Sequence, residues 1–316
     1  MSGVVMTTNE PVSESLLARK LRALVLLAGT VRQGRLGSMI GRPVFDLPLG
    51  NGCSIMDDWR RESEVLAGMV AGGRLSVRVM IDRATSQPPL ARASLPGDAV
   101  QIQIERDPLE YRGTGGVLRD VGAVYAEDDY LLVANAAQVL MEPLADLAVA
   151  LSAICGDVAI VSHRDGTPSG MFLVRCGVLR ELPETGFVDM KEQALPAIAA
   201  HHQVAVIERD RPSAMPVLGL WDYVTAVRRH QQRMAGATDP DGPFAEDWEC
   251  AFSIVEPGAN VHASARLHDS VVLCDGRVEA DTVLAHSVVC PGGVLRRGQM
   301  AIDALIAPGG NVRQRE

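Results

Sequence analysis

Residues 24–49 have the sequence LVLLAGTVRQGRLGSMIGRPVFDLPL, and the rest of the chain is interpreted around this stretch. It contains most of an apolar run, residues 23–28, which predicts a buried strand. The run ends at Gly29, and a loop rich in glycine and arginine follows. A strand that opens into a glycine loop near the start of a helix presents backbone N–H groups to an anion. The stretch therefore predicts an anion-binding loop in an α/β domain, and an ordinary strand and turn is the alternative.

Strands and helices are predicted to alternate from this stretch to about residue 235. Apolar runs and alternating patterns predict further strands at 75–81, 99–104, 129–134, 158–162, 171–175 and 204–208. Helical spacing of apolar residues predicts helices at 54–71, 111–125, 144–154, 179–182, 191–201 and 220–233. This alternation implies a parallel or mixed sheet with helices on both faces. We therefore expect one α/β domain at residues 21–235, after a flexible tail at residues 1–20 with a short helix from Ser13.

The composition changes after this domain. Residues 236–253 carry turn residues and few apolar ones, which predicts a linker. Across residues 254–316 an apolar residue surrounded by small residues recurs at six-residue spacing within three groups, which are Val255, Val261 and Leu267, then Val272, Val278 and Leu284, then Val289, Leu295 and Ala301. This repeat is typical of a hexapeptide β-helix with about 18 residues per coil, in which the apolar side chains point into a narrow shaft. A small conventional β-domain is the alternative. Because a short stack exposes its ends, we expect it to pack against the first domain or another subunit.

Composition excludes several classes of protein. The net charge of −9 argues against a nucleic-acid partner, which needs a basic face. No apolar run reaches the length of a membrane span, and the chain begins without the pattern of a signal peptide. The six cysteines lack metal-ligand spacing, so we expect reduced thiols in a cytoplasmic protein and no metal site. Only Lys20 and Lys191 are lysines.

Five segments of the predicted domain carry motifs in a fixed order. They are LAG at 27–29 with RL at 35–36, GTGGVLR at 113–119, DYLLVANAA at 129–137, SGMFLV at 169–174 and FVDMKEQALP at 187–196. This set resembles the motifs of the sugar-1-phosphate nucleotidyltransferases, namely L-A-G-G-x-G-T-R-L, G-T-A/G-G-A-L, D-D-F-L-V-x-N-G-D, N-A-G-I-Y-V and an acidic segment before L-L-P. Many members of that family also carry a hexapeptide tail. The resemblance implies a nucleotidyltransferase-like, Rossmann-like domain followed by a left-handed parallel β-helix.

The resemblance also implies roles for individual residues. Those that match nucleotide-binding positions are Ala28, Gly29, Thr30, Gly34, Gly113, Thr114, Gly115, Gly116 and Asn135. Arg35 and Arg42 match the cationic, catalytic positions of the loop. Gly170 and Lys191 match the segments that hold the sugar phosphate.

Several expected residues are missing from these motifs. Family members hold Mg²⁺ with two aspartates, and the corresponding positions here are Ala137 and Val217, whose side chains offer no oxygen ligand. The two lysines of the family's P-K-P and E-K-P segments have no counterpart either. Arginine at position 42 is not equivalent to lysine, although it can hold a phosphate with two hydrogen bonds. Nucleotidyl transfer gathers negative charge that Mg²⁺ and cations must stabilise, so the sequence predicts weak or lost catalysis.

Three hypotheses for function follow. The first is a regulatory or scaffold homologue that binds a nucleotide or nucleotide sugar, either as a homo-oligomer or as the partner of an active nucleotidyltransferase. The second is an active, divergent sugar-1-phosphate nucleotidyltransferase that makes a nucleotide sugar and uses Mg²⁺ as its cofactor. The third is a hexapeptide acyltransferase that uses a histidine of the repeat as base, and the candidates are His262, His268 and His286.

The remaining polar candidates have structural interpretations. His201 and His202 are expected at a solvated helix end. The carboxylate pairs at 57–58 and 128–129 are expected to be charges at the start of a helix and of a strand. Trp221 is expected in the core.

Overall fold

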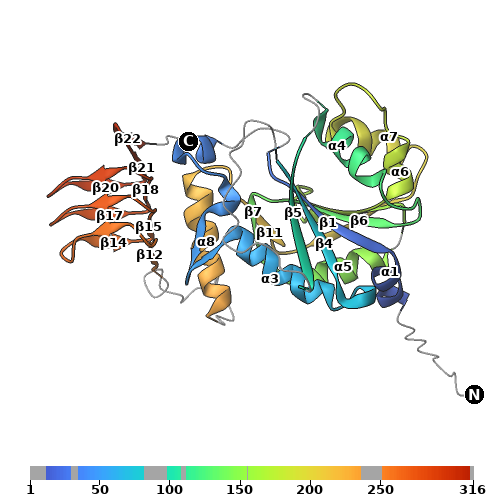
Figure 1. Ribbon diagram of the computed structural model, residues 1–316, viewed down its shortest axis with the longest axis horizontal. Coiled ribbons are helices and arrows are strands. Elements are labelled where there is room, and N and C mark those ends of the chain that lie inside the picture. Colours follow the sequence, from blue (N-terminus) through green and yellow to red (C-terminus); the bar gives the residue numbers. More distant parts are fainter. Residues whose placement is uncertain are drawn as a thin grey trace, which may run out of the picture.

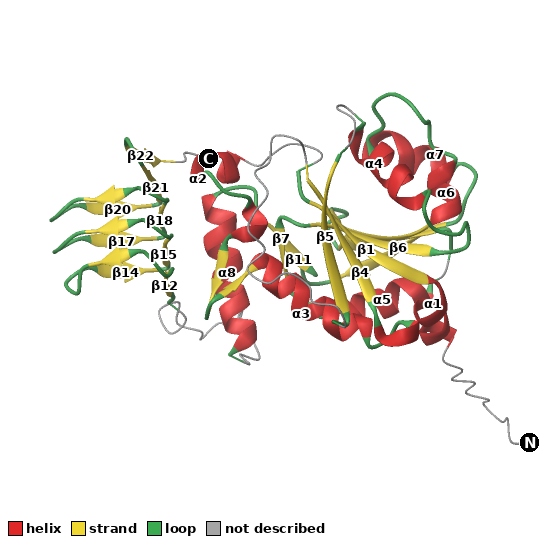
Figure 2. Ribbon diagram, viewed as in Figure 1, coloured by secondary structure: helices red, strands yellow, loops and turns green. Residues whose placement is uncertain are grey.

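The structure is a computed structural model, described for residues 12–29, 35–81, 98–107, 112–154, 156–235 and 251–313. Residues 12–235 form an α/β domain, and residues 251–313 form a stack of short strands that we call the C-terminal stack (Figure 1). Figure 2 shows that helices dominate the outside of the first unit, whereas the second contains strands and turns.

The α/β domain is built on a mixed sheet of seven strands in the order β10-β8-β9-β6-β1-β4-β5. Strand β9 is antiparallel to both of its neighbours, and the other neighbouring pairs are parallel. The strands are β1 (Leu21–Leu27), β4 (Leu75–Ile81), β5 (Val100–Arg106), β6 (Tyr130–Asn135), β8 (Val158–His163), β9 (Pro168–Arg175) and β10 (Val204–Arg209).

Helices cover both faces of this sheet, because alternate residues of its central strands are apolar on both sides. In β1, Leu24 and Leu26 pack on one face and Ala23 and Val25 on the other. The first face meets α1 (Val12–Lys20), α3 (Ile55–Ala67), α5 (Leu144–Ala153) and α8 (Leu220–Met234). The second meets α4 (Gly113–Gly122), α6 (Cys176–Arg180), the π-helical turn η3 (Met190–Ala194) and α7 (Leu195–Ala199). The short remaining elements are α2 (Arg35–Ile40), η1 (Val44–Asp46), β2 (Pro48–Gly50), β3 (Cys53–Ser54), η2 (Ala71–Gly73), β7 (Gln138–Leu140) and β11 (Ala214–Pro216).

Each strand and helix predicted for residues 23–233 is present, with shifted ends. The short helix expected from Ser13 is present as α1. It packs against α5 with Leu17 fully buried, so residues 12–20 belong to the domain and not to the expected flexible tail. Residues 1–11 lie outside the described part, and so does most of the expected linker, residues 236–250.

The C-terminal stack contains three parallel ladders of short strands, an arrangement consistent with a β-helix. One ladder is β12 (Ser253–Val255), β15 (Ser270–Val272), β18 (Val288–Val289) and β21 (Ala304–Ala307), closed by the antiparallel β22 (Gly310–Arg313). The others are β13 (Asn260–Val261), β16 (Arg277–Val278) and β19 (Val294–Leu295), and β14 (Arg266–His268), β17 (Val283–Ala285) and β20 (Met300–Ile302).

Each coil of the stack is 17 residues long and not 18, since Ser253 pairs with Ser270 and Arg266 with Val283. The missing residue is at one corner of the coil. Across this corner the next inward-facing side chain comes after five residues, whereas it comes after six at the other corners. Asp269, His286 and Asp303 occupy this corner in successive coils, with φ of 44°, 45° and 51°. The left-handed backbone turns the chain in a shorter step, and Asp accepts this conformation more readily than most residues.

The predicted shaft of inward-facing apolar side chains is present along most of the stack. Val272, Val278, Leu284, Val289 and Leu295 form a buried cluster, against which Val261 and Leu267 pack as partly buried residues. Val255 differs from the prediction, because it is 46% exposed although it is in register with Val272. The physical reason is its place in the first described coil, where no earlier described coil covers it.

The C-terminal stack packs against α2, α8 and β2, and we call this contact the seam (Figure 1). Ile254, Val271, Val288 and Leu305 point out of the stack and belong to the same buried cluster as the α/β domain's first face. The expected packing of the stack against the first domain is therefore confirmed.

Two ion pairs reinforce the seam. Arg228 of α8 donates to the fully buried carboxylate of Asp269. Arg42 donates to both oxygens of Glu256 at 3.0 and 2.8 Å. The two units are thus joined by apolar packing and by charge.

No helix among the described residues has the length and apolar composition needed to cross a membrane.

Candidate functional site

A cavity of about 680 Å³ opens at the carboxyl ends of β1 and β6. In open α/β sheets, ligands bind outside the carboxyl ends of the parallel strands. Leu27 and Asn135, the last residues of the two strands, lie in its wall. Opposite walls come from the segment around Arg42, from η3 and from residues 217–218.

The cavity gathers many of the residues that the resemblance singles out. Those in its lining are Ala28, Gly29, Arg42, Thr114, Asn135, Gly170 and Lys191. Thr30 and Gly34 lie outside the described residues, and so does the side chain of Arg35, whose backbone begins α2. The roles assigned to these three remain predictions.

Three of the four residues of the glycine motif serve packing. Gly113 has a φ of 69°, and a Cβ on it would lie 2.4 Å from the carbonyl oxygen of Val188. The N–H of Gly115 donates to that same oxygen at 2.8 Å. Gly116 packs against the side chain of Arg112. Of the motif, only Thr114 is in the lining, and its hydroxyl accepts a hydrogen bond from the N–H of Met190 at 3.0 Å.

The two positions expected to carry metal-binding aspartates meet at the cavity. Val217 donates its N–H to the carbonyl oxygen of Ala137 at 2.9 Å, and both residues line the wall. The side chain of Asn135 accepts a hydrogen bond from the N–H of Ala137 at 3.0 Å, which fixes the turn after β6. The fold therefore brings together two positions far apart in sequence, and both side chains there are apolar.

The guanidinium of Arg42 is occupied by protein carboxylates. Its Nε donates to Asp46 at 2.9 Å, and Nη1 donates to Glu256 of the C-terminal stack. Burial disfavours the charge, but the hydrogen bond to Glu256 and the charges of Asp46 and Glu256 outweigh it and raise the pKa of Arg42. Its expected role in binding phosphate therefore competes with these ion pairs.

Lys191 is the more available cation in the lining. Its side chain is 67% exposed, and its Nζ lies 3.9 Å from Glu192, which is a loose contact. Its N–H and that of Glu192 donate to Asp189 Oδ1 at 2.9 and 2.8 Å, so Asp189 caps the start of η3. Among the described residues, Asp189 and Glu192 are the two carboxylates in the lining.

Most of the remaining lining is apolar. Sequence reasoning did not select these residues for the site, although Met171, Phe172 and Leu195 lie within the quoted motifs. The apolar lining comes from η1, β8, β9 and the start of α7, and includes Val44, Phe45, Ile160, Met171, Phe172 and Leu195. The cavity thus combines a broad apolar surface with few charged groups, as is typical of small-molecule sites.

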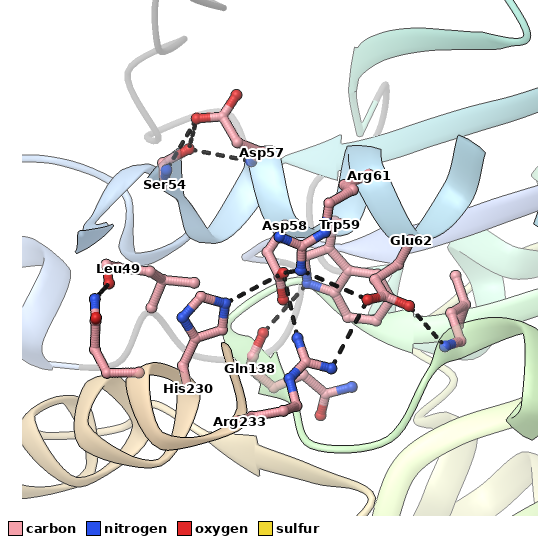
Figure 3. A network of polar contacts seen from close by, with 12 residues as sticks. Leu49, Ser54, Asp57, Asp58, Trp59, Arg61, Glu62, Gln138, His230 and Arg233 are labelled. Atoms are coloured by element: carbon pink, nitrogen blue, oxygen red, sulfur yellow. Dashed lines mark hydrogen bonds and ion pairs between the residues drawn. The ribbon is translucent and has the colours of Figure 1, made fainter. Parts of the chain in front are cut away.

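The paired carboxylates at 57–58 lie away from this cavity and have two different roles (Figure 3). Asp57 and Ser54 form a capping box at the start of α3. The carboxylate of Asp57 accepts a hydrogen bond from the N–H of Ser54, and the hydroxyl of Ser54 accepts one from the N–H of Asp57. Asp58 is buried and meets Arg61, His230 and Arg233, the last two from α8. Asp58 is therefore more than the expected charge at a helix start, because it ties α3 to α8.

The other carboxylate pair joins the start of β6 to the start of β1. Asp129 accepts a hydrogen bond from Arg22 Nε at 2.8 Å, and Asp128 pairs with Lys20. The expected strand-start charges are thus both used in ion pairs.

Two expectations for single residues also change. Trp221, expected in the core, is 56% exposed and sets its ring edge-on to His286 in the seam. His202 lies at a helix end as expected, and it also contacts Glu181 at 2.9 Å and Asp157 at 3.3 Å.

No protein-family model matches the chain, and no curated protein matches it.

Proposed function

We propose that this chain binds a nucleotide or nucleotide sugar in the cavity and has lost metal-dependent nucleotidyl transfer. The observation that supports the proposal most directly is the meeting of Ala137 and Val217 at the cavity wall. These are the positions where the resemblance expects carboxylates, and apolar side chains cannot hold a hard cation.

Binding without turnover fits the other groups in the lining. Ala28 and Gly29 follow β1 in the lining. The N–H of Ala28 donates to the carbonyl oxygen of Met80 at 2.8 Å, so the N–H of Gly29 is the backbone donor proposed to meet a phosphate. Lys191 can add a mobile positive charge. The apolar wall near Phe172 suits a base or ribose. On this proposal the domain is nucleotidyltransferase-like, the C-terminal stack is a left-handed β-helix, and the protein acts as a regulatory or scaffold subunit.

Calorimetry on the full chain tests binding, with nucleoside diphosphates, nucleoside triphosphates and nucleotide sugars as ligands. We expect Lys191→Ala to weaken a measured affinity by about tenfold, the effect of losing one charge-assisted hydrogen bond. Lys20→Ala is the matched control, because it removes the other lysine, which pairs with Asp128 outside the cavity lining. Equal affinities for both variants, or no binding of any of these ligands, would contradict the proposal.

A blocking variant provides a second test. Ala137→Phe would place an aromatic ring in the cavity, whereas Ala123→Phe would place one on an exposed site outside the lining. We expect only the first to abolish ligand binding, with both variants folded as judged by circular dichroism.

The alternative, an active divergent enzyme, is favoured by one observation. Asp189 and Glu192 are carboxylates in the cavity lining, and a cation could use them in place of the missing aspartates. A coupled pyrophosphate assay with Mg²⁺, nucleoside triphosphates and sugar 1-phosphates decides between the two. Turnover in the usual enzymic range of about 1 to 10³ per second, lost in Asp189→Asn, would establish the alternative.

A further inference from the structure

We infer that the seam contains a binding site for a divalent transition-metal ion of the zinc class, formed by His268, Asp269 and His286. One ligand atom of each residue lies within 4.8 Å of those of the other two. This site is distinct from the cavity, and the inference does not rest on the proposed nucleotide binding.

The corner of the coil brings these residues together. Asp269 and His286 occupy the same left-handed corner position in consecutive coils. His268 directly precedes the first of them, and its ring lies edge-on to that of His286 with centroids 5.6 Å apart. The 17-residue coil therefore places two imidazoles from neighbouring coils beside one carboxylate.

The distances suit metal ligation better than hydrogen bonding. His268 Nε2 and His286 Nε2 lie 3.5 and 3.7 Å from Asp269 Oδ2. Nitrogen-to-oxygen hydrogen bonds are rarely longer than about 3.2 Å. In a tetrahedral zinc site with metal–ligand bonds of about 2.0 to 2.1 Å, neighbouring ligand atoms are about 3.3 Å apart. A small adjustment of the two histidine rings would complete that geometry.

The carboxylate is oriented before any ion binds. Asp269 is fully buried, and its Oδ1 accepts the N–H of Phe252 at 3.0 Å. Arg228 donates to Oδ2 from α8, and a carboxylate oxygen has a second lone pair free for a ligand on the side of the stack. Since Arg228 already neutralises Asp269, the two histidines are not needed as its counter-charges.

A second carboxylate supports one of the imidazoles. Asp303, at the corner of the next coil, has its Oδ1 3.3 Å from His286 Nδ1, an ion-pair contact just beyond the usual hydrogen-bond length. Metal-binding histidines commonly donate their other ring N–H to a carboxylate, which directs the free lone pair at the metal. His268 is 46% exposed, so water can occupy the remaining position of the ion.

The test is a titration of the full, untagged chain with Zn²⁺ after treatment with a chelator. We expect calorimetry to show a single ion per chain, with no binding of Mg²⁺ or Ca²⁺, which prefer oxygen ligands. With Co²⁺ as probe, we expect the strong visible absorption of a tetrahedral site without a thiolate charge-transfer band. That spectrum would exclude the free cysteines Cys53 and Cys274 as the ligands.

Variants assign the site. We expect His286→Ala to weaken Zn²⁺ binding by more than about 100-fold, and Asp303→Asn by about 10- to 100-fold. His262→Ala is the matched control, since His262 is an exposed histidine of the same stack whose Nδ1 contacts Ser264 at 2.9 Å. His268→Gln serves as a second variant if His286→Ala does not fold. Absence of binding, or equal affinities for the His262, His268 and His286 variants, would overturn the inference.

Discussion

At the cavity wall, Ala137 and Val217 stand where the family resemblance expects carboxylates, whereas at the seam the buried carboxylate of Asp269 meets Arg228 and two histidines. The chain thus places apolar side chains where the resemblance leads us to expect charge, and it places charges where its two structural units join. Arg42 belongs to both regions, because it lines the cavity and binds Glu256 across the seam.

On the proposed function, this difference shows how a site can keep its shape and lose its chemistry. The strand ends and the tight packing around Val188 do not require a metal ligand in the cavity. The seam depends on shared apolar packing and on a few paired charges, and a paired charge loses its effect when its partner is removed. Variants in the seam should therefore affect stability more than variants in the cavity wall.

Removal of the C-terminal stack should have the largest effect. A chain that ends near Met234 loses Ile254, Val271, Val288 and Leu305 from a shared core. Each buried side chain of this size contributes about 1.5–3 kcal/mol, against a total stability of about 5–15 kcal/mol. We expect a much lower melting temperature and a changed oligomeric state by light scattering. An unchanged melting temperature and an unchanged number of subunits would show that the stack is an independent appendage.

Glu256→Gln should have an intermediate effect and shows whether the seam restrains the cavity. We expect a loss of about 1.5–3 kcal/mol in the free energy of unfolding, the usual value for hydrogen bonds to charged groups, measured by urea denaturation. We also expect tighter binding of inorganic phosphate, because the guanidinium of Arg42 is released.

Glu279→Gln is the matched control for this variant. Glu279 accepts the N–H of Arg297 at 2.9 Å, much as Glu256 accepts that of Cys274 at 2.8 Å. Equal losses of stability for both variants would show that the ion pair with Arg42 adds nothing.

His202→Gln should have the smallest effect. His202 follows α7, which lies on the side of the α/β domain away from the stack (Figure 1). The hydrogen bond to Glu181 raises the pKa of His202 above its ordinary value of 6.5. Because the pKa is raised on folding, protonated His202 stabilises the folded state. This stabilisation is complete below the ordinary pKa of 6.5 and is lost as the pH rises through the folded-state pKa.

Denaturation of both proteins at about pH 5.5 and about pH 8.5 measures this contribution. We expect the variant to be less stable by under about 1 kcal/mol at the lower pH and equal to the original chain at the higher pH. A difference that grows with pH would contradict the assignment.

The sequence predicts the fold well where one pattern determines one element. The apolar runs at β1 and β6 and the helical spacing of α3 and α8 identify those elements directly. The six-residue repeat predicts the shaft, because each inward side chain is apolar. The short strands β7 and β11 are missed, since they pair with each other over a long separation and carry no pattern of their own.

The cavity and the seam differ in how far sequence could predict them. Strand ends and motif order indicate that Asn135, Gly170 and Lys191 approach one another. The sequence around Arg42 does not indicate that this residue binds Glu256, which lies 214 positions later in the chain. The partner depends on how the stack docks, which the six-residue spacing does not specify.

The short corner of each coil has a consequence for how such a chain can vary in length. Because the corner recurs every 17 residues, as the pairing of Ser253 with Ser270 shows, duplication of one whole coil would preserve the register of every ladder. It would lengthen the stack by one strand spacing, about 4.8 Å, and add one more corner side chain to the row. Insertion of a single residue at one corner would instead remove the left-handed turn there. It would also displace the row of corner residues, Asp269, His286 and Asp303, relative to α8. Length in this part of the molecule is therefore modular, and it can change only in complete coils without altering the surface that docks.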